Sequence, residues 1–306
     1  MVNSEIAARL LELKREKRAL ILAHNYQRPE VQDVADFVGD SVELSRKAMN
    51  EQDSRIILFS AVDFMAETAA ILNPTKKVLL PSLGARCPMA HMLPAETVRA
   101  WKSRYPGVPV VLYVNTLAES KAESDVSCTS ANAVKVVESL DSDKVLFGPD
   151  RHLARYVAEK TGKTVIAVPE NGFCPTHVLF LKEDVLLAKE ANPGSIVMAH
   201  PECVEEVLKC ADFIGSTSQI CRFAKECPAK SFVVATEVGI LHRLKKENPG
   251  KSFTPAYAGA VCPSMKRNTL ELMYQVLRDE SNVVRVPPSI AARARRSIER
   301  MFEATK

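Results

Sequence analysis

A threefold internal repeat is the feature that most constrains the fold of this 306-residue chain. A Cys-Pro pair occurs at Cys87, Cys174 and Cys262, with separations of 87 and 88 residues (174 − 87 and 262 − 174). A chain that repeats one unit at a fixed period folds as copies of that unit. We therefore expect three homologous units, each with one cysteine at the same place.

Each unit opens with a run of aliphatic residues that ends in polar side chains. The three runs are LILAHNY at 20–26, VVLYVNT at 110–116 and IVMAHPE at 196–202. A second apolar run follows in each unit, from Arg55, Lys144 and Ser231, and a third run precedes each cysteine. Short apolar runs of this kind predict buried strands.

A small hydroxyl residue opens a helical pattern after the first run of each unit. These residues are Ser41, Ser130 and Thr217, which are 89 and 87 residues apart (130 − 41 and 217 − 130). We predict that they are helix N-caps. Helix N-termini present backbone N–H groups and the positive end of the helix dipole, so we expect the three helix starts to bind carboxylate or phosphate groups.

The alternation of strands and helices predicts the fold class. Parallel strands joined by helices form a sheet that is covered on both faces. We predict an α/β protein of three homologous αβα sandwich domains, each with a small parallel sheet, around a pseudo-threefold axis. The predicted domains are 1–88, 89–175 and 176–263, and the C-terminal helical segment 264–306 is expected to pack on the first.

Polar side chains gather where the first strand of each domain ends. In open parallel sheets, ligands bind beyond the carboxyl ends of the strands. Three domains around one axis would aim these side chains and the cysteines at one cavity. There we expect Glu202 and His200 to act as acid and base, and the hydroxyl of Tyr26 or Tyr113 to relay a proton. The residues at these strand ends are His24, Asn25, Tyr26, Tyr113, Asn115, His200 and Glu202.

Charge and cysteine usage exclude several classes of protein. The net charge of +4 is small for this length and argues against a nucleic-acid-binding protein. No uncharged apolar run is long enough to span a membrane. Eight cysteines without a secretory leader indicate reduced thiols or metal ligands. We expect a cytoplasmic protein that binds neither nucleic acid nor membrane.

The three repeated cysteines predict a metal centre if they converge. Three sulfur ligands suit either zinc or an iron-sulfur cluster. A closed zinc site needs a fourth ligand, for which His177 is the candidate. A 4Fe-4S cluster held by three cysteines leaves one iron open to act as a Lewis acid on a hydroxyl or carboxylate. The cysteines outside the repeat are expected to be ordinary thiols: Cys128, Cys203, Cys210, Cys221 and Cys227.

Eleven segments, in order along the chain, carry a resemblance to a known family. They are LAHNYQ at 22–27, VGDS at 38–41, FMAE at 64–67, YVN at 113–115, TSAN at 129–132, GPDR at 148–151, PENGFCP at 169–175, HPE at 200–202, GST at 215–217, TEVGILH at 236–242 and VCPSMKRNTL at 261–270. With these segments the chain resembles the quinolinate synthases of NAD biosynthesis across essentially its whole length.

The resemblance implies a transferase-type condensing and dehydrating enzyme. Its substrates would be iminosuccinate and dihydroxyacetone phosphate, and its products quinolinate, phosphate and two waters. It implies one 4Fe-4S cluster per chain, held by Cys87, Cys174 and Cys262, with the open iron as Lewis acid. It also implies that an aspartate oxidase or dehydrogenase supplies the iminosuccinate.

Site residues follow from the same resemblance, position by position. Proton transfer and cyclisation would involve Glu202, His200, Tyr26, Tyr113 and His177. Substrate contacts would come from His24, Ser41, Tyr113, Asn115, Ser130, His200, Glu202, Thr217 and Lys266.

Three other hypotheses remain open from the sequence. Two are iron-sulfur enzymes: a reductive dehydroxylase like the hydroxymethylbutenyl diphosphate reductases, and a radical enzyme like those that form the diphthamide precursor. Neither explains the segments HPE and PENGFCP. The third is a zinc-stabilised repeat scaffold without catalytic activity, which would be colourless, whereas a cluster-bearing protein would be brown.

Overall fold

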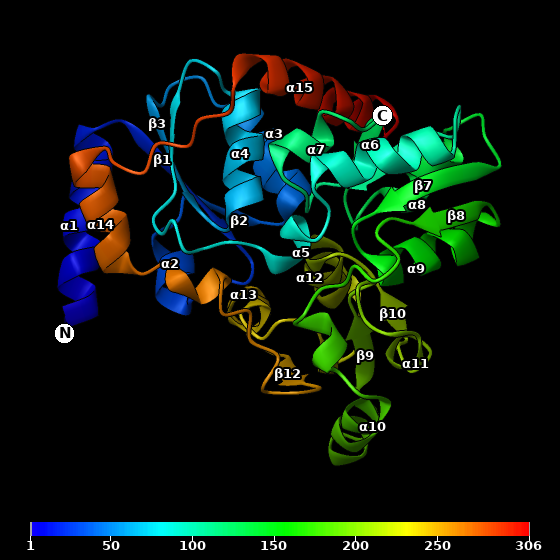
Figure 1. Cartoon of the computed structure of the whole chain (residues 1–306). Helices are drawn as coiled ribbons and strands as arrows, with labels where there is room; N and C mark the ends of the chain where they lie inside the picture. Colours follow the sequence, from blue (N-terminus) through cyan, green and yellow to red (C-terminus); the bar gives the residue numbers. More distant parts are fainter. Residues whose placement is uncertain (1, 306) are drawn as a thin grey trace. The chain divides into compact units, whose positions relative to one another are not determined.

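The structure is a computed structural model that describes residues 2–305. These residues form three sheets of four parallel strands each (Figure 1). The strand orders are β2-β1-β3-β4, β6-β5-β7-β8 and β10-β9-β11-β12, so the three sheets share one topology. The predicted α/β class, with three small parallel sheets flanked by helices, is confirmed.

The strands of each sheet come from one repeat of the sequence. The first sheet holds β1 (Ala19–His24), β2 (Phe37–Gly39), β3 (Ile56–Ser60) and β4 (Lys77–Leu79). The second holds β5 (Val110–Tyr113), β6 (Val126–Cys128), β7 (Lys144–Gly148) and β8 (Thr164–Ala167). The third holds β9 (Ile196–Ala199), β10 (Phe213–Ile214), β11 (Ser231–Ala235) and β12 (Ser252–Pro255).

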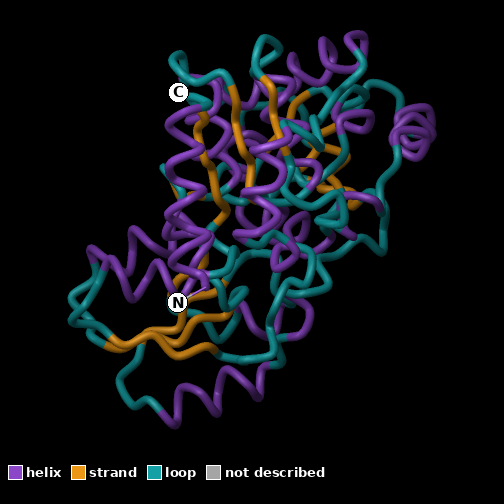
Figure 2. Tube along the Cα trace, turned by 90° about the vertical axis from the view of Figure 1, so that its left-hand side faces the viewer, coloured by secondary structure: helices purple, strands orange, loops and turns teal. Residues whose placement is uncertain are grey.

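A pair of helices that contact each other covers one face of each sheet. These pairs are α3 (Ser41–Asn50) with α4 (Asp63–Leu72), α8 (Ala133–Glu138) with α9 (Arg151–Thr161), and α12 (Thr217–Glu226) with α13 (Ile240–Glu247). In Figure 2 the neighbouring strands of a sheet (orange) lie side by side, and helices (purple) lie next to them.

The opposite face of each sheet carries the remaining larger helices. On the first sheet these are α1 (Val2–Glu16), α2 (Pro29–Val34) and α14 (Leu270–Asp279), and α1 lies beside α14 (Figure 1). On the second sheet α6 (Ala95–Arg104) contacts α7 (Ala118–Lys121), and on the third α10 (Lys182–Ala191) contacts α11 (Glu205–Leu208).

Short turns follow the three repeated cysteines, and one long helix lies near the end of the chain. The turns are α5 (Pro88–His91) and the 3-10 turns η1 (His177–Leu179) and η2 (Met265–Arg267). The long helix is α15 (Pro288–Glu303). No helix among the described residues is long and apolar enough to cross a membrane.

The central strands are apolar on both faces because both faces are covered. Every residue of β1 is buried, and alternate residues enter different layers. Ile21 and Ala23 pack in a cluster with Leu10 of α1 and Met273 of α14. This arrangement explains why the sequence of these strands shows continuous aliphatic runs rather than an alternation of apolar and polar residues.

An aspartate ties the start of each first strand to the segment before its edge strand. In all three repeats the aspartate carboxylate accepts a hydrogen bond of 2.8 Å from a strand amide 15 residues earlier, and the aspartate amide donates back to the carbonyl of that same residue. The pairs are Asp36 with Ile21, Asp125 with Val110, and Asp212 with Val197. The repeat is therefore visible at the level of single hydrogen bonds.

We expect Asp125→Ala to lower the free energy of unfolding by about 1 kcal/mol, because the Val110 amide loses a charged acceptor whose side chain is partly exposed. Urea unfolding monitored by circular dichroism would measure the change. Asp141→Ala, at an exposed position of the same repeat, is the control and should change the midpoint little. Equal midpoints for both variants would contradict a stabilising role for Asp125.

The chain divides into two compact units by its internal contacts. One unit contains residues 2–87 with Cys262–Ala292, and the other contains Pro88–Val261 with 293–305. The second and third sheets lie in the same unit. The predicted domain boundaries near residues 88, 175 and 263 stay a prediction.

Within the segment 264–306, residues up to Ala292 group with the first unit and residues 293–305 group with the second, and the predicted packing of the segment on the first domain stays a prediction. The buried face of α15 carries Ser297, whose hydroxyl oxygen lies 2.7 Å from those of both Ser124 and Ser127. These hydroxyls belong to the second repeat. Part of the segment therefore joins the second repeat because its polar partners lie there.

Ser41 and Thr217 are the first helical residues rather than the N-caps we predicted. The N-caps are the preceding residues: Asp40 accepts from the amides of Val42 and Glu43, and Ser216 accepts from the amide of Gln219. In the second repeat α8 begins only after Asn132, two residues beyond Ser130. The capping oxygens belong to the residues that reach the N3 amide, which the hydroxyl pattern alone does not identify.

Candidate active site

A tight turn follows the first strand of the first repeat and holds two predicted site residues. The amide of Tyr26 donates to Nδ1 of His24 at 3.1 Å, and the two rings meet edge to face with centroids 4.6 Å apart. His24 pairs in register with Gly39, two residues before Ser41. The turn thus brings His24 and Tyr26 together near the start of α3.

The turn after Cys262 packs on this strand end. The side-chain amine of Lys266 donates to the carbonyl of Tyr26, and the guanidinium of Arg28 donates to the carbonyl of Lys266 at 2.9 Å. Gln27 donates through Nε2 to the sulfur of Met265. Lys266 therefore lies beside Tyr26, because its side chain contacts Tyr26 and its carbonyl contacts Arg28.

The loops of Cys87 and Cys262 adjoin within the same unit. The hydroxyl of Ser264 donates to the carbonyl of Arg86 at 2.6 Å, so the residue before Cys87 contacts the residue two after Cys262. Both cysteines are half-buried. The first unit thus gathers His24, Tyr26, Ser41, Lys266 and two of the three repeated cysteines at one edge of its sheet.

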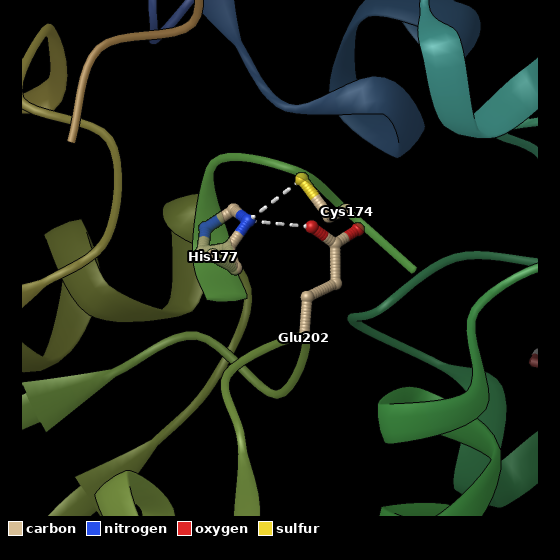
Figure 3. A group of neighbouring side chains, drawn as sticks. All are labelled: Cys174, His177 and Glu202. Carbon is tan, nitrogen blue, oxygen red and sulfur yellow. Dashed lines mark hydrogen bonds and ion pairs between the residues drawn. The ribbon is translucent and has the colours of Figure 1, made fainter. Parts of the chain in front are cut away.

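The second unit contains a compact group of Cys174, His177 and Glu202 (Figure 3). Nδ1 of His177 lies 3.1 Å from the sulfur of Cys174 and 2.7 Å from Oε2 of Glu202. Nε2 of His177 lies 2.9 Å from the hydroxyl of Thr236, which follows β11. His177 and Glu202 are almost fully buried, whereas Cys174 is half-buried.

His200 extends this group toward the second repeat. Its ring stacks on His177 with centroids 4.6 Å apart, and its Nε2 lies 3.2 Å from the hydroxyl of Ser130. The amide of Glu202 donates to its Nδ1 at 3.3 Å, which repeats the turn seen at His24 and Tyr26. The Tyr113 hydroxyl hydrogen-bonds Glu202. Side chains from two sheets therefore meet around one carboxylate.

Two carboxyl groups in this unit have pKa values that are pushed apart. Burial raises the pKa of Glu202, but the neighbouring histidines and hydrogen bonds from His177 and Tyr113 outweigh it and hold the pKa well below its usual range. Burial and the charge of Glu202 raise the pKa of Asp150 well above its usual range. Such divergence between neighbouring groups is typical of acid and base sites.

Burial lowers the pKa of His200 from 6.5 to about 3. Between these pH values the unfolded chain binds more protons, so the folded state loses stability as the pH falls below about 6.5. At pH 5 we expect a loss of about 2 kcal/mol relative to pH 7 from this residue. Urea unfolding of metal-free protein at both pH values should show a smaller loss in His200→Gln. An identical pH dependence in the variant would contradict the assignment.

Thr217 and Asn115 belong to the same unit. Thr217 is buried at the start of α12, and Gln219 of that helix donates to the carbonyl of Ala131 beside Ser130 at 3.3 Å. Oδ1 of Asn115 is buried without a hydrogen-bond partner. A buried acceptor left unpaired is costly and indicates a bound donor.

The predicted residues thus form one group in each unit. The first unit holds His24, Tyr26, Ser41, Lys266, Cys87 and Cys262. The second holds Tyr113, Asn115, Ser130, Cys174, His177, His200, Glu202 and Thr217. The convergence of all three cysteines stays a prediction, because Cys174 belongs to the other unit.

The sequence reasoning missed the polar residues that follow the second strand of each repeat. Asp63, Asp150 and Glu237 are 87 residues apart (150 − 63 and 237 − 150). The amide of Cys87 donates to Asp63 and the amide of Cys174 donates to Asp150, each at 3.0 Å. Their spacing equals the cysteine period, and that signal would have found them.

Comparison with known proteins identifies the family. The sequence model described as Quinolinate synthetase A protein matches residues 8–303. A quinolinate synthase of Methanothermobacter thermautotrophicus is 54% identical over 297 residues, covering 97% of each chain. A quinolinate synthase of Pyrococcus abyssi is 54% identical over 98% of this chain and 99% of its own. One from Thermotoga maritima is 51% identical over 96% of this chain and 98% of its own. With matches over nearly its whole length, the chain belongs to the quinolinate synthetase A family.

Proposed function

We propose that the chain is a quinolinate synthase that condenses iminosuccinate with dihydroxyacetone phosphate and releases quinolinate, phosphate and two waters. The observation that carries the proposal is that quinolinate synthases share more than half of their residues with this chain over nearly all of its length. The proposed site of action is the cytoplasm. The imine substrate would come from an enzyme that oxidises aspartate, an aspartate oxidase or dehydrogenase.

The thiols fit a cluster with one open iron. Cys87, Cys174 and Cys262 are half-buried, and each is followed by proline and a short helical turn. Cluster iron is held by thiolates, and three of them leave one iron without a protein ligand. When bound, such a cluster would supply a Lewis acid that polarises an oxygen of the substrate.

The neighbouring side chains suit a small dianion with two carboxylates. Neutral hydrogen-bond donors surround the strand ends, namely the His200 ring, the Ser130 hydroxyl and the start of α12 at Thr217. Asn115 offers a buried oxygen that would accept from an imine or enamine N–H. Lys266, at the first strand end, offers a positive charge for a carboxylate or phosphate.

Glu202 is the group best placed to move protons. It is ionised and almost fully buried, and hydrogen bonds from His177 and Tyr113 hold its carboxylate, so it would take a proton from one substrate atom and return it to another. Isomerisation, ring closure and two dehydrations each require a proton to leave one atom and reach another. Tyr26, beside His24, would serve the same purpose from the first unit.

A zinc site is the second candidate, and one observation favours it. Ligand atoms of Cys174, His177 and Glu202 all lie within 4.8 Å of one another, and thiolate, imidazole and carboxylate all bind zinc. A protein that held only zinc there would be a colourless scaffold. Metal analysis after anaerobic purification separates the two candidates: about four irons per chain favour the cluster, and stoichiometric zinc without iron favours the scaffold.

An anaerobic assay for quinolinate tests the proposed function directly. Oxaloacetate and ammonia would provide the imine, and dihydroxyacetone phosphate would be added with reconstituted protein. We expect quinolinate and phosphate in equal amounts, and no quinolinate when dihydroxyacetone phosphate is omitted. Brown, cluster-loaded protein that makes no quinolinate under these conditions would overturn the proposal.

A further inference from the structure

Two of the repeated cysteines are held by a carboxylate from the preceding helix start. Oδ1 of Asp63 accepts from the Cys87 amide at 3.0 Å and from the Phe64 amide at 2.9 Å. Oδ2 of Asp150 accepts from the Cys174 amide at 3.0 Å, while its Oδ1 accepts from the Leu153 amide at 2.7 Å. In both repeats the carboxylate connects the cysteine to the first turn of a helix.

A backbone hydrogen bond reinforces each connection and occurs in all three repeats. A helix-start amide donates to the carbonyl two residues before the cysteine. The pairs are Asp63 with Ala85 at 2.8 Å, Arg151 with Gly172 at 2.9 Å, and Val238 with Ala260 at 3.1 Å. Glu237 precedes Val238 and occupies the position of Asp63 and Asp150 in the third repeat. The cysteine loops are therefore built to one plan.

The close approach at Gly172 shows how tightly the Cys174 loop is seated. A side-chain carbon at Gly172 would lie 1.9 Å from the carbonyl oxygen of Pro149, the residue before Asp150. Only glycine lets the two backbone segments come this close. The loop is fixed to the strand end on which Asp150 lies.

None of these contacts involves the sulfur atoms, so they do not compete with a ligand for them. Each fixes the backbone that carries a sulfur. Cysteine loops outside helices and strands lose conformational freedom when they bind a metal, and partners that fix the ligands beforehand raise affinity. A carboxyl group suits this purpose because its two oxygens can accept several backbone hydrogen bonds at once.

We propose that Asp63 and Asp150 are positioning residues that hold the backbones of Cys87 and Cys174 in the geometry needed to bind the metal centre. The inference rests on the proposed function for the identity of that centre. The hydrogen bonds themselves can be tested in the metal-free protein, whatever the centre is.

Hydrogen exchange of the metal-free protein gives the first test. Pro88 and Pro175 carry no amide proton, so peptides that end at these prolines report on the cysteine amides. We expect Asp63→Ala to speed exchange at Cys87 by about tenfold or more. Asp63→Asn should speed exchange less than Asp63→Ala, because asparagine retains one oxygen that can accept the hydrogen bonds from the Cys87 and Phe64 amides.

Asp150→Asn should behave differently, because both of its oxygens accept hydrogen bonds and the amide nitrogen of asparagine cannot. Exchange at Cys174 should rise by about tenfold in this variant. Should this buried substitution prevent folding, the pair Asp63→Ala and Asp63→Asn still decides the matter. Asp184→Ala is the control, since Asp184 accepts from the Leu181 amide at the start of α10.

Iron release from reconstituted protein to a chelator gives the second test. Asp63→Ala should lose iron about tenfold faster than wild type, Asp63→Asn should lose it at a rate between the two, and Asp184→Ala should match wild type. Unchanged exchange at Cys87 in Asp63→Ala, or equal acceleration in Asp184→Ala, would overturn the proposal. Wild-type protein that takes up no iron would count against the proposed function, whereas the exchange results would still decide whether the aspartates hold the cysteines.

Discussion

Alanine in place of Cys87, Cys174 or Cys262 is expected to give a folded protein that retains no iron after anaerobic reconstitution. Three thiolates are the fewest that hold a cubane cluster with one open corner, and removing one leaves too few ligands. All three side chains are half-buried, so the substitutions leave no large cavity. Iron and sulfide analysis, together with the visible absorption of the protein, measures how much cluster is retained. Quinolinate formation should fall to background.

Cys227→Ala is the matched control for these variants. Cys227 is also a half-buried free thiol, but it ends α12 and lies outside the repeat of the Cys-Pro pairs. Cys128→Ala adds a fully buried control, in which burial raises the thiol pKa and disfavours a thiolate ligand. Both controls should keep their iron. Full iron content in any of the three test variants would refute the ligand assignment.

Glu202→Gln is expected to lower the turnover number by about a hundredfold or more, while iron content stays at the wild-type level. Glutamine keeps the shape of the side chain but cannot take up a proton. It also cannot accept from both His177 and Tyr113 through two oxygens, as an ionised carboxylate can. The steady-state rate of quinolinate formation, normalised to bound iron, measures the effect.

Glu205→Gln, three residues along the chain, provides the control for Glu202→Gln. Glu205 is a partly exposed residue of α11 that pairs with Lys209. This substitution should leave the normalised rate unchanged. Wild-type turnover in Glu202→Gln would remove Glu202 from the catalytic mechanism, and a loss of iron in that variant would instead point to a ligand role in line with its contact to His177.

The central strands of the fold could be predicted because each is a long buried run. The runs that became β1, β5 and β9 stand out by their apolar composition and by their period. The edge strands β2, β6 and β10 were missed, since they have only three, three and two residues and no pattern that short is distinctive. Their pairing with the central strand depends on contacts that a linear pattern does not contain.

Some residues of the candidate site could be predicted from the sequence pattern, and others could not because their contacts depend on packing. His24, Tyr26, His200 and Glu202 were predicted because they are polar residues that directly follow an apolar strand. The hydrogen bond from Cys174 to Asp150 was not, because it joins residues 24 apart whose proximity depends on the path of the loop. The stacking of His177 on His200 likewise requires the folded chain.

The turns at His24 and His200 decide what these two rings can do. With Nδ1 of each ring occupied by a backbone amide two residues on, the ring hydrogen sits on Nε2. The Nε2 atom of each ring is then the atom that can donate, and the turn fixes its direction. Within the second unit, the His200 ring can therefore donate to a carboxylate without a change in its own charge, because burial lowers its pKa to about 3.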